Sequence, residues 1–384
     1  MQPDIIPLIV ILLIFVSSIL AAYLKLSVAI IEIILGAAAG ILGLRPEEWM
    51  IFLATYGGIL LTFLAGTEID TTLLKKNFKV CFIIGFFSFI IPFIGCFSFA
   101  YFFLHWNTAS SLITGIALSE TSLAVVYSVL IEMGLSNTYI GNILMATTFV
   151  TNMFVALSLS IIFIKPTLFT LIFFIIAVLV IFLAYKYSDK LFKNKIIKNK
   201  VIEPEIKYIF LLLMIFIYFA KLGDSHAILP AFLLGLFMSG HFSRTKDERV
   251  VMVRLRTVAY AFITPLFFIV GGLRISLPMI ISSFSLFAIF FLIKIITKFA
   301  GVYYFAKKYI PSGNMYVTLL MSTGLTFGTI ASIFGLQSGL IDQAQYSILI
   351  GVMVTSAIIP TFIAQRWFAP KEEEDMLDIP QPEN

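Results

Sequence analysis

Residues 115–122 read GIALSETS, and residues 321–329 read MSTGLTFGT. Each stretch places glycine, serine and threonine in the middle of a long apolar run, 108–133 in the first case and 313–336 in the second. Inside a bilayer, backbone polar groups must find partners within the protein, and these residues supply them where a helix is interrupted. The two stretches therefore predict two membrane-spanning helices that are each broken near the middle. Close helix packing by small residues is the alternative for either stretch taken alone.

The composition of the chain indicates a membrane protein. Of 384 residues, 60% are hydrophobic and only 12% are charged, and the mean hydropathy is +1.04. A soluble domain carries about 25% charged residues. A soluble core cannot bury this much apolar surface, so we expect the lipid bilayer to be the main partner of the chain. The first apolar run, 4–24, lacks a preceding basic segment and is long enough to span, so we expect no cleavable signal peptide.

Apolar runs separated by charged and turn residues predict thirteen membrane spans of an all-α protein. They lie at 4–24, 27–43, 50–69, 80–104, 108–133, 138–164, 167–186, 206–222, 226–241, 257–273, 279–306, 313–336 and 344–366. If the N-terminus is outside, twenty of the 26 lysines and arginines fall on the cytoplasmic side, four fall outside, and Lys294 and Lys298 lie within a span. The positive-inside rule therefore predicts an external N-terminus and a cytoplasmic C-terminus.

A basic stretch in the middle of the chain divides the predicted spans into two sets. The first six spans begin outside and the last six begin inside, so a repeat between them has inverted topology, as in many secondary transporters. The two predicted broken helices are the fifth spans of these sets. The predicted organisation is a first repeat with the seventh span (1–186), a cytoplasmic linker (187–205), a second repeat (206–368) and a short, acidic, disordered tail (369–384).

Polar side chains inside the predicted spans are the candidates for function. Glu120, Lys294 and Lys298 lie well inside spans, and ionisable residues there are costly and typically mark ion pathways. Lys294 and Lys298 share one helix face, and a lysine that reaches the membrane interface is the alternative for either. The candidate residues of the two helix breaks are Ser119, Thr121, Ser122, Thr323, Gly324 and Thr326.

Several classes of function have no support in the sequence. We find no metal-binding triad, no nucleophile elbow and no phosphate-binding loop, so we expect neither an enzyme nor a cofactor. The net charge of +5 comes from residues in short loops, which argues against nucleic-acid binding. These features favour a secondary ion transporter.

Seven stretches, in this order and spacing, resemble the membrane domain of the monovalent cation:proton antiporter 2 family of prokaryotic exchangers. They are FLAGTEID (63–70), ALSETSLAVV (117–126), GNILMATTFVTNMFVALSLSIIF (141–163), AILPAFLLGL (227–236), ITPLFFIVGGLRISL (263–277), KFAG (298–301) and SAIIP (356–360). The resemblance extends over residues 5–368. It implies thirteen spans, a core domain with two crossed broken helices, a dimerisation domain, an elevator motion and a homodimer in the plasma membrane of a prokaryote. It also implies exchange of Na⁺ or K⁺ for H⁺, without identifying which cation.

The resemblance places the ion site in the span after the first broken helix, where the family has an essential aspartate. The corresponding pair here is Thr151 and Asn152. An amide cannot release a proton, so this departure leaves three alternatives. The chain is an altered or inactivated antiporter that needs aspartate at 152, or the titrating group has moved to Glu120, or the protein is a cation conductor or sensor that is not coupled to protons. A solute symporter of related fold is the alternative from another transport class. Lys298 matches the family's core-domain lysine, so we expect it near Thr151 or Glu120.

Overall fold

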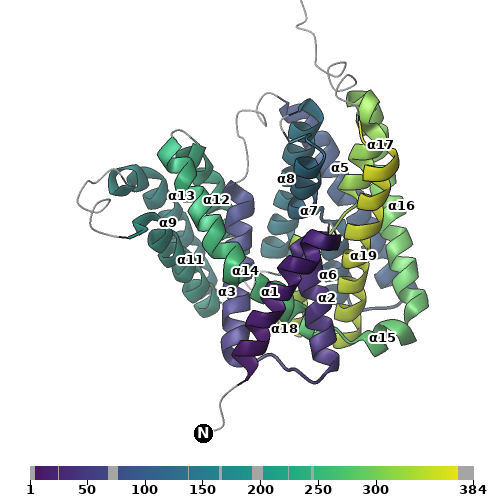
Figure 1. Ribbon diagram of the computed structural model, residues 1–384, viewed down its shortest axis with the longest axis horizontal. Helices are drawn as coiled ribbons and strands as arrows, with labels where there is room; N and C mark the ends of the chain where they lie inside the picture. Colours follow the sequence, from purple (N-terminus) through teal and green to yellow (C-terminus); the bar gives the residue numbers. More distant parts are fainter. Residues whose placement is uncertain are drawn as a thin grey trace, which may run out of the picture. The chain divides into compact units, whose positions relative to one another are not determined.

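The computed structural model describes residues 5–24, 26–67, 77–136, 138–163, 167–192, 202–223, 225–243 and 246–370, and all secondary structure in these ranges is helical. The helices are α1 (Ile6–Leu24), α2 (Val28–Ile41), α3 (Glu48–Thr67), α5 (Phe78–Ser98), η1 (Phe99–Phe103), α6 (Thr108–Ser119), α7 (Leu123–Glu132), α8 (Tyr139–Ile162), α9 (Leu168–Phe192), α11 (Pro204–Leu222), α12 (Ile228–Ser243), α13 (Lys246–Val258), η2 (Ala259–Ile263), α14 (Thr264–Leu273), α15 (Leu277–Ser282), α16 (Phe284–Tyr309), η3 (Pro311–Gly313), α17 (Asn314–Met321), α18 (Thr326–Gln337) and α19 (Gln343–Trp367) (Figure 1).

Every predicted span contains a helix. In the described part of the chain, ten helical segments are long and apolar enough to cross a membrane, and Val28–Ile41 and Ile228–Gly240 are shorter apolar helices. Helix α11 lies where the eighth span is predicted. The chain is thus a multi-pass, all-helical membrane protein, while the count of thirteen crossings stays a prediction. Most of the predicted tail, from residue 371 onward, lies outside the described residues.

Three predicted spans differ from the observed helices. The span 167–186 corresponds to α9, which continues to Phe192, inside the predicted linker. The predicted span 279–306 is divided, because α15 ends at Ser282 and α16 begins at Phe284 after a break in helical geometry at Ser283. The predicted span 257–273 begins earlier, because α13 runs through the π-helical turn η2 directly into α14. Pro265 follows this turn. A proline ring clashes with the carbonyl four residues before it, and the wider turn accommodates that ring.

The chain forms two compact units, and each takes residues from both halves of the predicted repeat. The first unit comprises residues 1–45, 72–155 and 271–384, and the second comprises 46–71 and 156–270. Within the second unit, α3 packs against α12. A Cβ atom on Gly66 would overlap the carbonyl oxygen of Phe232, so glycine permits this close approach of two helices.

In the first unit, α5 packs against both α6 and α16, and α18 packs against α6 and α19. Figure 1 shows α16 running beside α19, in agreement with their contacts. Every residue in the most apolar 18-residue window of Pro311–Gln337, the segment that contains α17 and α18, is buried. The second predicted broken helix therefore lies in the centre of this unit.

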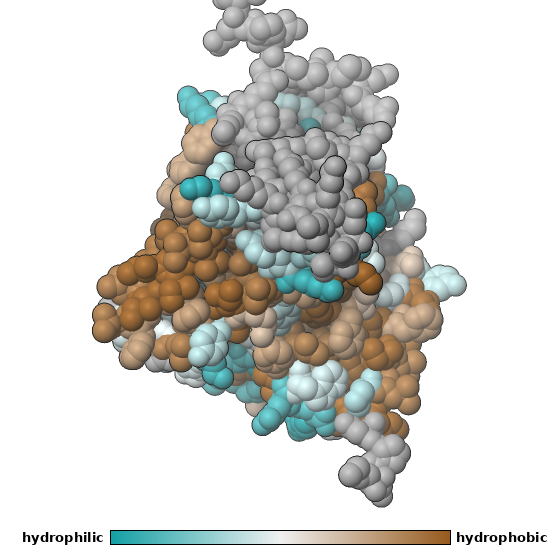
Figure 2. Space-filling model, turned by 90° about the vertical axis from the view of Figure 1, so that its left-hand side faces the viewer, coloured by the Kyte–Doolittle hydropathy of each residue, from teal (hydrophilic) through white to brown (hydrophobic). Residues whose placement is uncertain are grey.

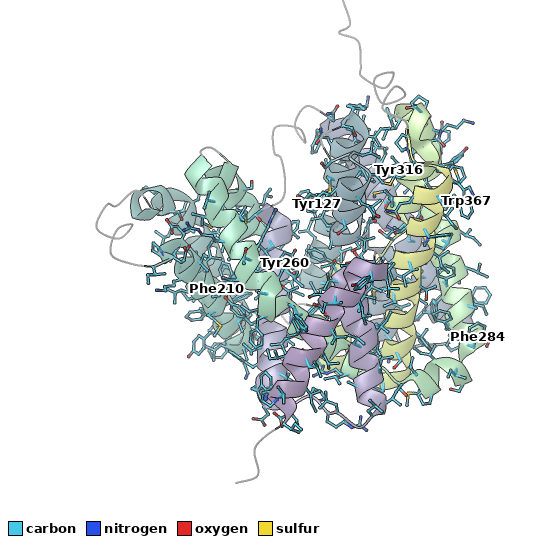
Figure 3. The ribbon with its side chains drawn as sticks, viewed as in Figure 1. Tyr127, Phe210, Tyr260, Phe284, Tyr316 and Trp367 are labelled. Atoms are coloured by element: carbon cyan, nitrogen blue, oxygen red, sulfur yellow. The ribbon has the colours of Figure 1, made fainter. Side chains whose placement is uncertain are left out.

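Hydrophobic side chains form much of the surface. Only 22% of the most apolar window of α1 is buried, and the value for α9 is the same. Figure 2 shows a wide hydrophobic area on one face of the molecule. Figure 3 shows Phe284 and Trp367, each 63% exposed, whereas Tyr316 on α17 is fully buried. Exposed apolar surface of this extent fits contact with lipid.

Candidate ion-binding site

The first interruption lies between α6 and α7. Helix α6 ends at Ser119, and the next residue, Glu120, is extended with φ −67° and ψ 163°. Ser122 begins the next helix, because its side-chain oxygen accepts a hydrogen bond from the backbone N–H of Val125 at 3.4 Å. Serine is a favoured residue at the N-terminal cap of a helix. The structure thus interrupts this segment at the predicted residues.

The second interruption lies between α17 and α18. The hydroxyl of Ser322 donates to the carbonyl of Thr318 at 2.8 Å, and the hydroxyl of Thr323 donates to the carbonyl of Leu320 at 2.7 Å. These bonds satisfy polar backbone groups near the end of α17, where the helical ladder stops. Helix α18 resumes at Thr326. This interruption also lies where the sequence predicts it.

The two interruptions cross each other. The hydroxyl of Thr121 donates to the carbonyl of Met321 at 2.8 Å, and the hydroxyls of Ser122 and Thr326 lie 3.2 Å apart in a hydrogen bond. The backbone N–H of Leu325 donates to Oε1 of Glu120. Oε2 of Glu120 has no hydrogen-bond partner among the described residues. A fully buried carboxylate therefore lies at the crossing, with one oxygen unpaired among the described residues.

Two lysines of α16 reach this crossing. Both Lys294 and Lys298 are fully buried, and both interact electrostatically with Glu120. The ammonium of Lys298 donates to the hydroxyl of Thr121 at 2.8 Å and to the hydroxyl of Ser88 on α5 at 2.9 Å. Lys298 thus ties the first break to α5 through Thr121, the residue that follows Glu120. In the described part of the chain, its ammonium donates to these hydroxyls and not to the Glu120 carboxylate.

Two glycines border Glu120. A Cβ atom on Gly324 would lie 3.4 Å from Oε1 of Glu120. A Cβ atom on Gly328 would lie 3.0 Å from Cγ of Glu120 and 2.7 Å from the carbonyl oxygen of Ala117. A larger residue at Gly328 would press on Glu120 and on the backbone of α6, whereas a Cβ atom on Gly324 would only touch the carboxylate. The close approach of α6 and α18 therefore depends on glycine.

Helix α8 carries Thr151 and Asn152, the pair at which the resemblance implies an aspartate. The hydroxyl of Thr151 donates to the carbonyls of Gly85 and Thr147, both at 3.2 Å. One turn earlier, Thr148 contacts the sulfur of Met321 at 3.4 Å. Asn152 is 1% exposed, and neither polar atom of its amide has a hydrogen-bond partner in the described part of the chain. Thr151 fastens α8 to α5, whereas the amide of Asn152 has unused binding capacity.

The structure brings together most of the predicted site residues. Glu120, Thr121, Ser122 and Thr326 meet at the crossing, with Lys298 bound to Thr121. The hydroxyls of Ser119 and Thr323 donate to backbone carbonyls of their own helical segments. These two residues therefore stabilise the helix ends at the breaks and do not bind the Glu120 carboxylate. The amide of Asn152 makes no hydrogen bond to any of them.

Sequence reasoning missed three contributions to the site. They are the hydroxyl of Ser88, the backbone N–H of Leu325 and the space at Gly328. The serine in the middle of the phenylalanine-rich helix α5 was a signal for the first. The other two are backbone features, which side-chain patterns do not identify.

Comparisons with known proteins identify the family of the chain. The family model described as sodium/hydrogen exchanger, transmembrane, matches residues 9–369. The chain is 26% identical over 356 residues to a protein of Methanocaldococcus jannaschii named probable Na⁺/H⁺ antiporter 3, with 90% of each chain covered. It is 28% identical over 356 residues to a Na⁺/H⁺ antiporter of Enterococcus hirae, covering 89% of this chain and 90% of that protein.

A solved structure shares the fold. The sodium proton antiporter MjNhaP1 of Methanocaldococcus jannaschii superposes with a TM-score of 0.68 over 94% of this chain and 97% of that one, at 16% identity. The resemblance to prokaryotic cation:proton exchangers is thus confirmed, although the label antiporter 2 is slightly off, because the matching model is that of the sodium/hydrogen exchangers. From its crossed broken helices and from the match over residues 9–369, the chain belongs to the sodium/hydrogen exchanger family.

Proposed function

We propose that this protein exchanges a monovalent cation, Na⁺ or K⁺, for protons, and that Glu120 is the carboxylate that both ions use in turn. The observation that carries the proposal is the position of Glu120. It is fully buried at the crossing of the two broken helices, with Oε1 bound by a backbone N–H and Oε2 without a partner. The names of the relatives from Methanocaldococcus jannaschii and Enterococcus hirae support sodium as the cation.

The exchange follows from the cost of a buried charge. A carboxylate away from water is unfavourable unless a proton or a cation neutralises it. A proton and a cation that need the same oxygen cannot both bind there, so loading one ion releases the other. Nearby hydroxyls and the carbonyls freed at the helix breaks can complete the coordination of the cation, as at other discontinuous membrane helices. Exchange then requires that only the neutralised site moves across the membrane.

Asn152 enters this proposal as a ligand and not as a proton carrier. Its amide is neutral and cannot release a proton, but its Oδ1 atom can bind a cation. The free amide, 1% exposed, fits that role. Among the three alternatives for position 152, the geometry of Glu120 favours transfer of the titrating role to that residue.

The wider architecture completes the proposal. We infer thirteen spans in two inverted repeats, an elevator movement of a core domain against a dimerisation domain, and a homodimer in a prokaryotic plasma membrane. The external N-terminus and cytoplasmic C-terminus rest on the distribution of lysine and arginine. Crossed broken helices in corresponding halves of the chain support the repeat.

The test is transport by purified protein in proteoliposomes that enclose a pH-sensitive dye. Addition of Na⁺ or K⁺ outside should change the internal pH in the wild-type protein, and Glu120→Gln should abolish this response. Glu132→Gln is the matched control, because Glu132 is an exposed carboxylate at the end of α7, the helix that follows the same break. Cation flux that persists without proton movement would instead establish a conductor, and flux of an organic anion would establish a symporter.

A further inference from the structure

Lys294 is a buried ammonium group without a hydrogen bond. It is fully buried in α16, and its Nζ atom has no hydrogen-bond partner among the residues that the structure describes. It faces the second helix break, because a Cβ atom on Gly324 would overlap Nζ. The same Cβ atom would lie 3.4 Å from Oε1 of Glu120. The ammonium of Lys294 and the carboxylate of Glu120 therefore border the same glycine.

The chemistry of these two groups makes each the natural partner of the other. An ammonium offers three donors, and a buried charge without a partner is strongly unfavourable. Oε2 of Glu120 is a charged acceptor that is also without a partner in the described part of the chain. Both groups border the Cβ position of Gly324, so a movement of the flexible lysine side chain can bring the ammonium to the carboxylate.

Lys298 is less available than Lys294 to pair with the carboxylate of Glu120. Its ammonium already donates to Ser88 and Thr121, at 2.9 and 2.8 Å. Lys294 is one helical turn away on the same helix face and has all its donors free. The two lysines thus differ in function, since one is fixed in a hydrogen-bond network and the other faces the carboxylate.

A transported cation needs the same carboxylate that Lys294 faces. Two positive charges beside one carboxylate repel each other, and the low polarity of the surroundings strengthens that repulsion. When a cation binds, the ammonium must withdraw, and when the cation leaves, the ammonium can return.

We propose that Lys294 is a tethered competitor of the transported cation for the carboxylate of Glu120, and that it determines the apparent affinity of the site for that cation. The inference rests on the proposed function of Glu120 as the cation-binding residue. It predicts that loss of the ammonium makes the cation bind more tightly and leave more slowly.

The experiment measures the KM and the maximal rate of Na⁺-dependent and K⁺-dependent proton movement in proteoliposomes. Lys294→Met removes the charge at similar volume, and Lys294→Gln keeps a hydrogen-bond donor without the charge. We expect both variants to lower the KM for the transported cation about tenfold or more, without a matching rise in the maximal rate. Lys307→Met is the control, because it removes an exposed charge from the last turn of the same helix and should leave the KM unchanged.

A second readout separates this inference from the proposed function. The Na⁺ or K⁺ concentration that half-maximally stabilises the detergent-purified protein against heat reports binding without transport. A lower concentration for Lys294→Met than for wild type supports the tethered competitor even if no proton exchange is detected. The inference would be overturned if folded Lys294→Met or Lys294→Gln showed an unchanged or higher KM together with an unchanged half-maximal concentration. In that case, exchange that still depends on Glu120 would leave the proposed function intact.

Discussion

The hydroxyl of Thr121 joins three parts of the site, and its removal tests whether the crossing is held as described. It donates to the carbonyl of Met321 in the second break and accepts from the ammonium of Lys298 on α16. Thr121→Val removes only this hydroxyl and keeps the shape of the side chain. It leaves one buried carbonyl and one donor of a buried ammonium without partners.

The expected loss of stability follows from these two bonds. Hydrogen bonds between membrane helices average about 0.6 kcal/mol each, whereas an unsatisfied buried group costs roughly 1–3 kcal/mol and more when charged. Because one lost partner is a charged ammonium, we expect Thr121→Val to cost about 1–3 kcal/mol. Thr114→Val is the matched control in α6, since that hydroxyl bonds only to the carbonyl of Ser110 in its own helix. Such a bond contributes little to stability.

The assay is thermal unfolding of the purified protein in one detergent, with both variants beside the wild type. The midpoint should fall clearly further for Thr121→Val than for Thr114→Val. Equal shifts would refute the reasoning, because they would mean that the bonds between the two breaks add nothing beyond a local hydroxyl.

Three further predictions concern neighbouring residues. Lys298→Met should lower the unfolding midpoint more than Lys294→Met, because of these two lysines only Lys298 donates hydrogen bonds to described residues, namely Ser88 and Thr121. Equal midpoints would contradict this. Gly328→Ala should cost roughly 1–3 kcal/mol and slow transport, because its Cβ atom would lie 2.7 Å from the carbonyl oxygen of Ala117, and an unchanged midpoint and rate would show that the helices separate freely. Asn152→Asp should retain exchange and shift its pH dependence by adding a second carboxylate, whereas exchange that appears only in this variant would return the essential role to position 152.

The helix breaks were predictable because their signal is local. Polar and small residues within an apolar run mark an interrupted membrane helix, and both interruptions lie where GIALSETS and MSTGLTFGT predict them. Glu120 was identifiable for the same reason, since a carboxylate inside such a run is costly.

The contacts between the breaks were not predictable from the sequence. The bond from Thr121 to Met321 joins residues 200 positions apart, and the bond from Lys298 to Ser88 joins residues 210 apart. Lys294 and Lys298 look equivalent in sequence because they lie on one helix face. Their different surroundings depend on α5 and on the second break, which only the tertiary structure brings to them.

The central claim is that a proton and a cation compete for the carboxylate of Glu120. Its most direct test is the release of protons when Na⁺ or K⁺ is added to the purified protein in weakly buffered solution. The account predicts release from the wild-type protein and from Glu132→Gln, and none from folded Glu120→Gln. Equal release from Glu120→Gln and wild type would contradict the account and place the exchanged proton on another group.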